Sequence, residues 1–380
     1  MQFPQIDLKK LRSFPRFWKR GPFGYNQPVM DIELLKRLCD TPGMPGDEGM
    51  VKAILLEEIK KFSEDVTEDV LGNIIARVPG DGPTFVLDAH MDEVGFMVHH
   101  IDNRGFLRVT PLGGMDARVF YGQRLVVWGK KTLKGVVAAI PPHVTRGSGS
   151  NKEVPEIEDC AIDLGLSPEK VTDLVKIGDV VSFDTSLDET EDSVISKALD
   201  DRIGLFVIIE ALRKTPNPGC DLIVTFTVQE EVGLRGARVI TPVYEPDFAV
   251  ALEGTVAMDI PGVSESKSLA NIGKGPEIRL SDRFLVAHRP FSFFIKELAE
   301  KNEIPCQVTV KKAGSTNATA MQVTGKGTRA AVLSVPTRYL HSPSSLAYKS
   351  DISHTIDLVS YLLKDIGKFS LSNQHQDAQQ

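Results

Sequence analysis

Five short motifs place side chains that can bind metal ions at the ends of apolar, strand-like segments. They are LDAHMD (87–92), KALDDR (197–202), VQEEVG (228–233), LEGT (252–255) and RYLHSP (338–343). In an open α/β sheet, the residues that bind ligands gather at the carboxyl ends of the strands. We therefore expect the five motifs to converge on one site, although no single motif is specific.

The first motif carries His90 and, two residues further on, Asp92. Residues two apart in an extended segment point the same way. The Asp92 carboxylate can therefore accept a hydrogen bond from the imidazole nitrogen that faces away from a metal, which fixes the tautomer of the histidine. Taken alone, a histidine in such a motif is more often structural than a metal ligand.

The next two motifs contain three carboxylates. Asp200 precedes a predicted helix, so it is either a helix N-cap or a carboxylate that bridges two cations. Glu230 and Glu231 lie at the end of the apolar run DLIVTFTV, after Gln229, where a charge is costly unless it is paired or binds a metal. Adjacent side chains point in different directions, so one glutamate can bind metal while the other acts as a general base. The alternative is a solvated loop.

Glu253 and His341 follow two further apolar strands and complete the set. Each of two divalent ions would then have one histidine, one terminal carboxylate and a share of Asp200. Ligation by nitrogen and oxygen together suits zinc or cobalt in a hydrolytic site. Two such ions, about 3.5–4 Å apart, can activate a water molecule between them.

The elements that would position these motifs alternate between helix and strand. Helical periodicity marks 31–40 and 48–62, and the apolar runs 84–88 and 221–228 are typical of strands covered on both faces. Between 94 and 187, short β-rich runs separated by Gly and Pro indicate a small barrel or sandwich. We predict an α/β fold: a mixed, mostly parallel sheet sandwiched by helices, with an inserted barrel-like domain.

The predicted catalytic domain covers 30–93 and 188–369, and the predicted insert 94–187 interrupts it. A closing helix is expected at 346–364. The two ends are expected to be disordered, at 1–29 and at 370–380. The first end has six basic residues and one acid, so the alternative is a basic arm that docks on an anionic partner.

Composition narrows the functional classes. With 42% hydrophobic and 25% charged residues the chain is typical of globular proteins, and no apolar run is long enough for a membrane-spanning helix. A net charge of −7 argues against nucleic acid as the main partner. The four cysteines are widely spaced and form no CxxC motif, which predicts reduced thiols in a cytoplasmic protein.

The five motifs together resemble metallopeptidase family forty-two. The stretches that carry the resemblance are HMDEVGFMV, KALDDRIG, VQEEVGLRGA, LEGTVAMDIPG and RYLHSP. This family comprises dinuclear aminopeptidases related to glutamyl aminopeptidase and to the tetrahedral dodecameric peptidases, and some relatives are labelled endoglucanase. The resemblance covers roughly 30–367, and the five motifs in this order are highly specific in combination.

The resemblance implies a role for seven residues. It assigns metal binding to His90, Asp200, Glu231, Glu253 and His341, with Asp200 bridging two ions. It makes Glu230 the general base and gives Asp92 the task of orienting His90. The implied activity is a metal-dependent aminopeptidase that acts on peptides with a free N-terminus. The implied assembly is a homo-oligomer, with a dodecamer as one expected form, built partly by the β-rich insert. Neither nucleic acid nor a membrane is an expected partner.

Two positions depart from the family's pattern. Position 253 is commonly Asp and is Glu here, whose longer arm can still bind a metal. The loop 314–318 is Gly-Ser-Thr-Asn-Ala where the family usually has Gly-Gly-Thr-Asp-Ala. Asn317 thus removes a negative charge near the site, which affects the expected substrate preference more than the chemistry.

Two other functions remain open at this point. One is a related dinuclear-metal hydrolase, such as a deacylase or carboxypeptidase. The other is a non-catalytic family member, although the presence of all seven positions speaks against it. An endoglucanase is disfavoured because glycosidases use a pair of carboxylates and no dinuclear metal centre.

Overall fold

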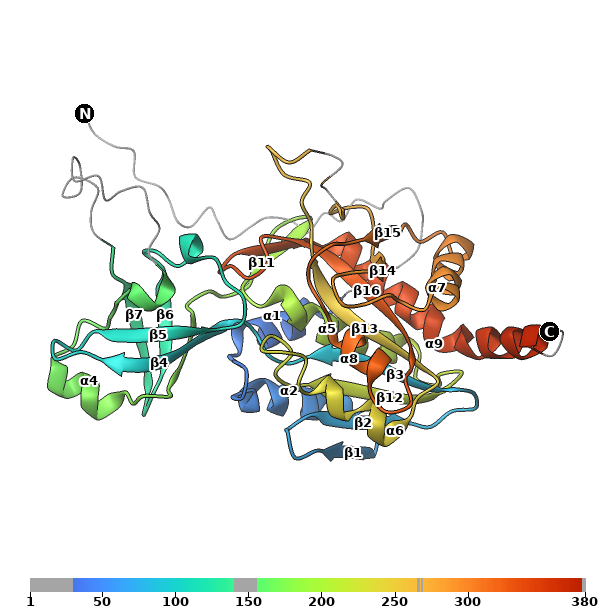
Figure 1. Cartoon of the computed structure of the whole chain (residues 1–380), viewed down its shortest axis with the longest axis horizontal. Coiled ribbons are helices and arrows are strands. Elements are labelled where there is room, and N and C mark those ends of the chain that lie inside the picture. The colour runs from blue at the N-terminus through green and yellow to red at the C-terminus, as the bar shows by residue number, and fades with distance from the viewer. Residues whose placement is uncertain (1–29, 140–155, 265–266, 268, 378–380) are drawn as a thin grey trace, which may run out of the picture. The chain divides into compact units, whose positions relative to one another are not determined.

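The computed structural model describes residues 30–139, 156–264, 267 and 269–377 (Figure 1). From Asp31 onward the chain forms one compact unit. The predictions made for 1–29 and for the last three residues lie outside the described residues. Within the described part, a large mixed sheet with helices is accompanied by a closed β-barrel.

The large sheet has the strand order β1-β2-β12-β3-β13-β16-β17-β11-β10, and β14 joins it beside β16 with β15 at its other side. The strands are β1 Asp65–Glu68, β2 Ile74–Val78, β3 Thr84–His90, β10 Asp188–Glu189, β11 Ser193–Ser196, β12 Asp221–Thr227, β13 Phe248–Val256, β14 Glu277–Ser281, β15 Gln307–Val310, β16 Arg329–Arg338 and β17 Ser345–Tyr348.

Parallel pairing is concentrated in the centre of this sheet. β12, β3, β13 and β16 run parallel, while β1, β2, β17, β11 and β10 pair antiparallel at the margins. The register sets Thr227 beside His90 and Ala251 beside Asp88. The carboxyl ends of β3, β12 and β13 therefore meet at one edge, as the sequence motifs require.

Helices cover both faces of the sheet. They are α1 Ile32–Asp40, α2 Gly49–Ile59, α5 Leu199–Lys214, α6 Thr241–Tyr244, α7 Arg289–Lys301, α8 Asn317–Val323 and α9 Lys349–Asp377. On β3, Val86 packs in a cluster with Met321 of α8, whereas the neighbouring Phe85 meets Phe291 of α7 on the opposite face. Burial on both faces explains why the central strands are continuous apolar runs. The predicted fold class is confirmed.

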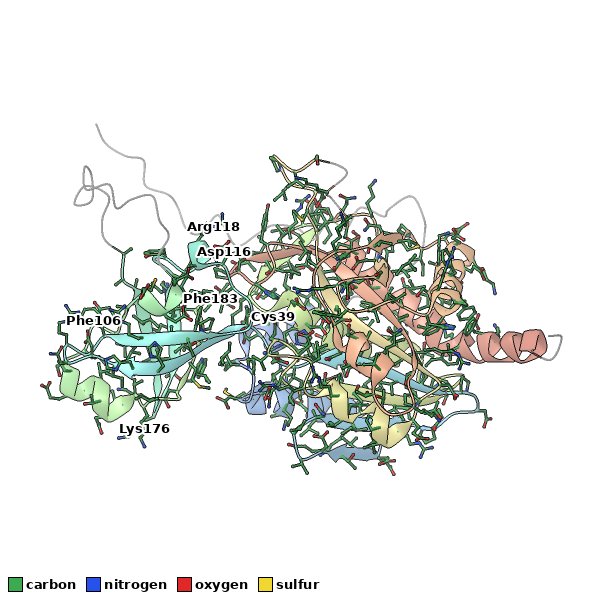
Figure 2. The ribbon with its side chains drawn as sticks, viewed as in Figure 1. Cys39, Phe106, Asp116, Arg118, Lys176 and Phe183 are labelled. Carbon is green, nitrogen blue, oxygen red and sulfur yellow. The ribbon has the colours of Figure 1, made fainter. Side chains whose placement is uncertain are left out.

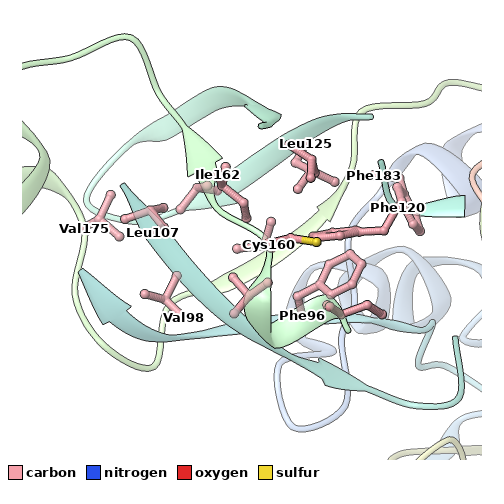
Figure 3. Packing of buried hydrophobic residues seen from close by; sticks show 14 of the residues in the cluster. Phe96, Val98, Leu107, Phe120, Leu125, Cys160, Ile162, Val175 and Phe183 are labelled. Carbon is pink, nitrogen blue, oxygen red and sulfur yellow. The ribbon is translucent and has the colours of Figure 1, made fainter. Parts of the chain in front are cut away.

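The barrel is formed by the stretch of chain between β3 and α5 (Figure 1, at the left). Its strand order is β4-β5-β8-β7-β6-β9. The elements are β4 Gly95–Ile101, β5 Leu107–Leu112, β6 Arg124–Trp128, β7 Thr132–Val137, β8 Ile162–Asp163, β9 Val180–Phe183 and helix α4 Pro168–Leu174. Phe96 packs with two other rings of its core, its ring centroid 4.6 Å from that of Phe120 and 5.5 Å from that of Phe183 (Figure 3).

The closing helix differs from the sequence prediction at both ends. The residues 346–348 belong to β17 and not to the helix, and α9 runs from Lys349 to Asp377. The segment 370–377, which was expected to be a disordered tail, continues this helix. The polar, Gln-rich composition of this segment gave no sign of a helix. The segment continues a helix whose earlier turns are stabilised by tertiary packing.

None of the helices in the described ranges is both long and apolar enough to cross a membrane. All four cysteines are free: Cys39, Cys160 and Cys220 are buried and Cys306 is partly buried. Free thiols agree with the absence of a disulfide framework that the cysteine spacing indicated. The cytoplasmic location stays a prediction.

A buried ion cluster joins the segment that follows β3 to the segment that precedes α5. Glu93 lies between β3 and the barrel strand β4, Lys197 lies between β11 and α5, and the Nζ of Lys197 donates to both carboxylate oxygens of Glu93, each at 2.7 Å. Arg202 adds a contact of 3.5 Å to Glu93 and donates to the carbonyl of Thr41 at 2.8 Å. The cluster therefore holds together the loops that carry His90 and Asp200.

Lys197→Met is expected to lower the free energy of unfolding by about 3–5 kcal/mol, because it leaves the Glu93 carboxylate buried with only the longer Arg202 contact. Urea unfolding followed by circular dichroism measures the change. Lys130→Met is the control, since it removes an ion pair with Asp173 whose side chains are both largely exposed, and it should change stability little. Equal effects of the two substitutions would show that the cluster does not stabilise the fold.

Candidate metal centre

His90 is the last residue of β3 and its side chain is buried. Its Nδ1 lies 3.1 Å from the backbone carbonyl oxygen of Asp92 and 3.4 Å from that residue's carboxylate. The Asp92 carboxylate in turn accepts the backbone N–H groups of Glu230 and Glu231, both at 3.0 Å. Asp92 thus lies beside His90, but the hydrogen bond of Nδ1 goes to the Asp92 carbonyl, and the carboxylate that was expected to accept it lies farther away. In addition, its carboxylate holds the loop that carries the two glutamates.

Asp200 lies at the start of α5, where its own backbone and that of Asp201 are not helical. The side chain that caps the helix beyond this irregular turn is that of Asp201, whose Oδ1 accepts the backbone N–H of Gly204 at 3.0 Å, so the interpretation of Asp200 as an N-cap is wrong. Its Oδ1 is 3.4 Å from the Nε2 of His90, and its Oδ2 is 3.5 Å from the Nε2 of His341. The carboxylate therefore lies between the two histidines, one oxygen facing each.

A further carboxylate accompanies each histidine. The Oε2 of Glu253 is 3.6 Å from the Nε2 of His90, and the Oε1 of Glu231 is 3.2 Å from the Nε2 of His341. We call His90, Glu253 and the Oδ1 side of Asp200 the first cluster. His341, Glu231 and the Oδ2 side of Asp200 form the second cluster. Potential ligand atoms of Asp201 and Glu230 also lie within reach of His90.

The register of the sheet explains why these side chains meet. Along β3, Val86, Asp88 and His90 alternate to the same face. Ala251 pairs with Asp88 on the neighbouring β13, so Glu253 emerges two residues later beside His90. β12 ends opposite His90 and is followed directly by the loop with Glu230 and Glu231.

The donor set fits divalent cations. Asp200 Oδ1 and Glu253 Oε1 are buried and have no hydrogen-bond partner among the described residues. Leaving charged oxygens buried and unpaired is costly, and metal coordination is one of the few ways to offset that cost. Both oxygens belong to residues of the first cluster, and Asp200 Oδ1 is also the oxygen that faces His90 Nε2. Imidazole nitrogen and carboxylate oxygen together are ligands that zinc and cobalt accept.

The electrostatics of the site point the same way. Burial raises the pKa of Glu253 well above its usual value, and the Glu230 carboxylate raises it further. Burial alone would lower the pKa of His341, but its contacts with Asp200 and Glu231 outweigh burial and raise the pKa to about 11. Protons and metal ions compete for the same imidazole nitrogens, so a site that attracts protons this strongly also favours a cation.

The two clusters open into a large cavity of about 1220 Å³. Glu230, Glu231, Glu253, Asp200 and His341 line it at the metal end. Apolar side chains and several basic residues line the remainder, among them Val256, Met258, Phe284, Lys267 and Lys312. A cavity of this size accommodates a ligand considerably larger than a single amino acid.

Two further carboxylates, which were not predicted from the sequence, support the strand that carries His90. Asp201 accepts the backbone N–H of His90 at 3.1 Å and that of Gly204 at 3.0 Å, so it fixes where β3 ends relative to α5. The buried Asp88 accepts a hydrogen bond from Asn317 at 2.8 Å. An acid inside the apolar run of β3 was the available signal for Asp88, whereas no local pattern distinguishes Asp201 from Asp200.

Asn317 is the first residue of α8 and contacts Asp88, two residues before His90 on β3. Its Nδ2 donates to Asp88 and, at 2.7 Å, to the hydroxyl of Thr227. Burial raises the pKa of Asp88 to about 6, and hydrogen bonds from Thr225 and Asn317 limit that rise. The amide at position 317 therefore supplies a donor to a buried acid, where a second carboxylate would add charge.

Comparisons with known proteins agree with this geometry. The family model described as M42 glutamyl aminopeptidase matches residues 72–358. The lysyl aminopeptidase of Pyrococcus furiosus is 33% identical over 344 residues, which cover 89% of this chain and 98% of that protein.

Two solved structures extend the likeness to the fold. Aminopeptidase APDkam598 from the archaeon Desulfurococcus kamchatkensis superposes with a TM-score of 0.84 at 34% identity, covering 88% of this chain and 94% of that one. The TET1 peptidase of Pyrococcus horikoshii, described as able to assemble into a tetrahedron or a large octahedral shell, gives a TM-score of 0.79 at 33% identity and covers 88% and 99% of the two chains. The chain is thus a peptidase and belongs to the M42 glutamyl aminopeptidase family.

Proposed function

We propose that this chain is a metal-dependent aminopeptidase that removes N-terminal residues from peptides at a two-metal centre, with Glu230 as the general base. The observation that carries the proposal is the position of Asp200, whose two carboxylate oxygens each face one histidine at 3.4 and 3.5 Å. Family membership supports the peptidase activity, and the adjoining cavity offers room for a peptide.

The residues that would hold the two ions follow from the two clusters. His90, Glu253 and Asp200 would hold the first, and His341, Glu231 and Asp200 the second. Zinc or cobalt suits this donor set. Two divalent cations of this kind lower the pKa of a shared water molecule and polarise a peptide carbonyl when bound.

Glu230 is the candidate for moving the proton. It lines the cavity next to Glu231, and its backbone N–H is fixed by Asp92 at 3.0 Å. In the proposed reaction its carboxylate takes a proton from the attacking water and passes it to the amine of the leaving peptide. Asp92 acts through its neighbours: it orients His90 and holds the backbone of both glutamates.

We also propose that the chain forms a homo-oligomer, with a dodecamer as one expected form and the barrel as an oligomerisation domain. The likeness to the TET1 peptidase, which assembles into closed shells, supports this. Light scattering on the purified protein measures the subunit number, and a monomer at micromolar concentration would contradict the proposal.

Asp200→Asn is expected to reduce the content of both metal ions together, because the amide can no longer offer a negative oxygen to each histidine side. Elemental analysis after gel filtration measures the ions per subunit. Asp173→Asn, which changes a largely exposed carboxylate on the barrel, should keep the wild-type content. Full occupancy in the Asp200 variant would reject the bridging role.

Glu230→Gln is expected to lower kcat by roughly 10²–10⁴-fold, since general acid–base catalysis contributes on this scale. Its metal content should stay close to that of the wild type, because the terminal ligands are unchanged. Steady-state kinetics and elemental analysis on the same preparation separate the two effects. Glu245→Gln, an exposed change beside Lys326, serves as the control. A normal kcat in the Glu230 variant would disprove its assignment as the base.

Aminoacyl chromogenic amides with a free amine should be hydrolysed, whereas N-acetylated amino acids and cellulose should not. A chelator should abolish the hydrolysis and zinc or cobalt should restore it, because the proposed reaction requires the metal ions that these ligands would bind. Faster turnover of acetylated amino acids would instead indicate a deacylase. Release of residues from the carboxyl end of peptides would indicate a carboxypeptidase.

A further inference from the structure

The two histidines of the candidate metal centre are supported differently. His90 ends the central strand β3, is 1% exposed, and keeps its Nδ1 beside a carbonyl of its own loop, that of Asp92. The side chain of His341 is 34% exposed and follows β16 on a loop. The large sheet and its own loops therefore position the first cluster. In the second cluster, Asp92 holds the backbone of Glu231, whereas the imidazole of His341 takes its Nδ1 contact from outside the large sheet.

That contact comes from the barrel. The Nδ1 of His341 lies 2.6 Å from the carbonyl oxygen of Gly114, which follows the barrel strand β5. A hydrogen bond from Nδ1–H to this carbonyl leaves Nε2 as the nitrogen that faces Asp200 and Glu231. A residue separated from His341 by 227 positions thus sets the orientation and tautomer of its imidazole.

The loop that contains Gly113 and Gly114 also lies close to the side chain of Glu231. Gly113 has φ +95°, and a Cβ placed on it would lie 2.7 Å from Val94 Cγ1 and 3.2 Å from Glu231 Oε2. Only glycine allows the backbone to approach the carboxylate this closely in this conformation. The next residues, Asp116 and Val119, line the cavity beside the candidate ligands.

The loop is held in place on the barrel side. Met115 and Ala117 pack against the buried barrel core that includes Phe120. Between and after them, Asp116 and Arg118, which are labelled in Figure 2, form a local ion pair. Upstream, β5 pairs with β4 through Leu112 and Gly95, next to Val94. The barrel core therefore fixes the backbone that reaches into the second cluster.

We propose that the Gly113–Gly114 loop of the barrel is the positioning element that completes the second metal subsite, so that binding of the second ion depends on the barrel while binding of the first does not. This inference rests on the two-metal centre proposed above. It assigns the barrel a role inside its own subunit, in addition to any role in assembly. Gly114 positions His341 and Gly113 limits where Glu231 can lie.

Gly113→Ala tests the proposal. Cobalt titrated into metal-free protein, followed by its visible absorption and by calorimetry, should show two binding steps in the wild type. In the variant the first step should be unchanged. The Kd of the second step should rise about 10-fold to 100-fold, as is typical when a residue supporting a metal ligand is altered. Elemental analysis after gel filtration should then give one ion per subunit in place of two.

A matched control separates this effect from general damage to the barrel. Gly122 has φ +67° and lies on the same barrel, and a Cβ there would meet no described atom within 4 Å. Gly122→Ala should retain two ions with wild-type affinity.

If Gly113→Ala alone does not fold, the double variant Val94→Ala/Gly113→Ala takes its place. It removes the closest contact of the new Cβ, that with Val94, and keeps the close contact with Glu231. Val94→Ala alone is its reference. An unchanged second step in the folded Gly113 variant would overturn the proposal and leave the two-metal centre intact. Loss of the second ion in Gly122→Ala as well would also overturn it. A wild type that binds fewer than two ions would overturn the two-metal centre, and this inference with it.

Discussion

The concentration of negative charge around Asp200 is the constraint on which the rest of the site depends. Its two oxygens face two histidines, and Glu231 and Glu253 lie on either side. Carboxylates at this density are stable in a buried site only if positive charge accompanies them. Asp200 Oδ1 and Glu253 Oε1 have no hydrogen-bond partner within the described part of the chain, which is where a cation would contribute most.

Several contacts of the surrounding fold hold these charged side chains in position. Parallel pairing of β12, β3 and β13 brings three strand ends to one edge. Asp201 fastens the end of β3 to the start of α5, and Asp92 fastens it to the glutamate loop. The Glu93–Lys197 pair joins the segment after β3 to the segment before α5. Buried hydrogen-bonded acids of this kind help to position the candidate ligands.

Sequence alone predicted the ligand candidates because their signals are local. His90, Glu231 and Glu253 each follow an apolar run, and the period of two along a strand determines which face a side chain takes. The bridging position of Asp200 depended on the family resemblance, since an aspartate before a helix is equally typical of an N-cap. In the structure its two oxygens face different histidines, so the bridging role proposed above is geometrically open to it.

The remainder was not predictable because it depends on contacts between distant segments. No local pattern links Gly114 to His341, and the two adjacent aspartates at 200 and 201 look alike in sequence although they face different partners. The extension of α9 to Asp377 was missed because its last turns are polar, and tertiary packing of the preceding turns overrides weak local propensity. The role of Asn317 as a hydrogen-bond donor depends on Asp88, which lies 229 positions away in the sequence.

Anomalous diffraction at the absorption edge of a bound metal tests the central claim most directly. Crystals of the protein loaded with zinc or cobalt should show two peaks per subunit, one on each side of the Asp200 carboxylate. One peak should lie between His90 and Glu253, and the other between His341 and Glu231. A single peak, or two peaks that do not share Asp200, would contradict the two-metal centre.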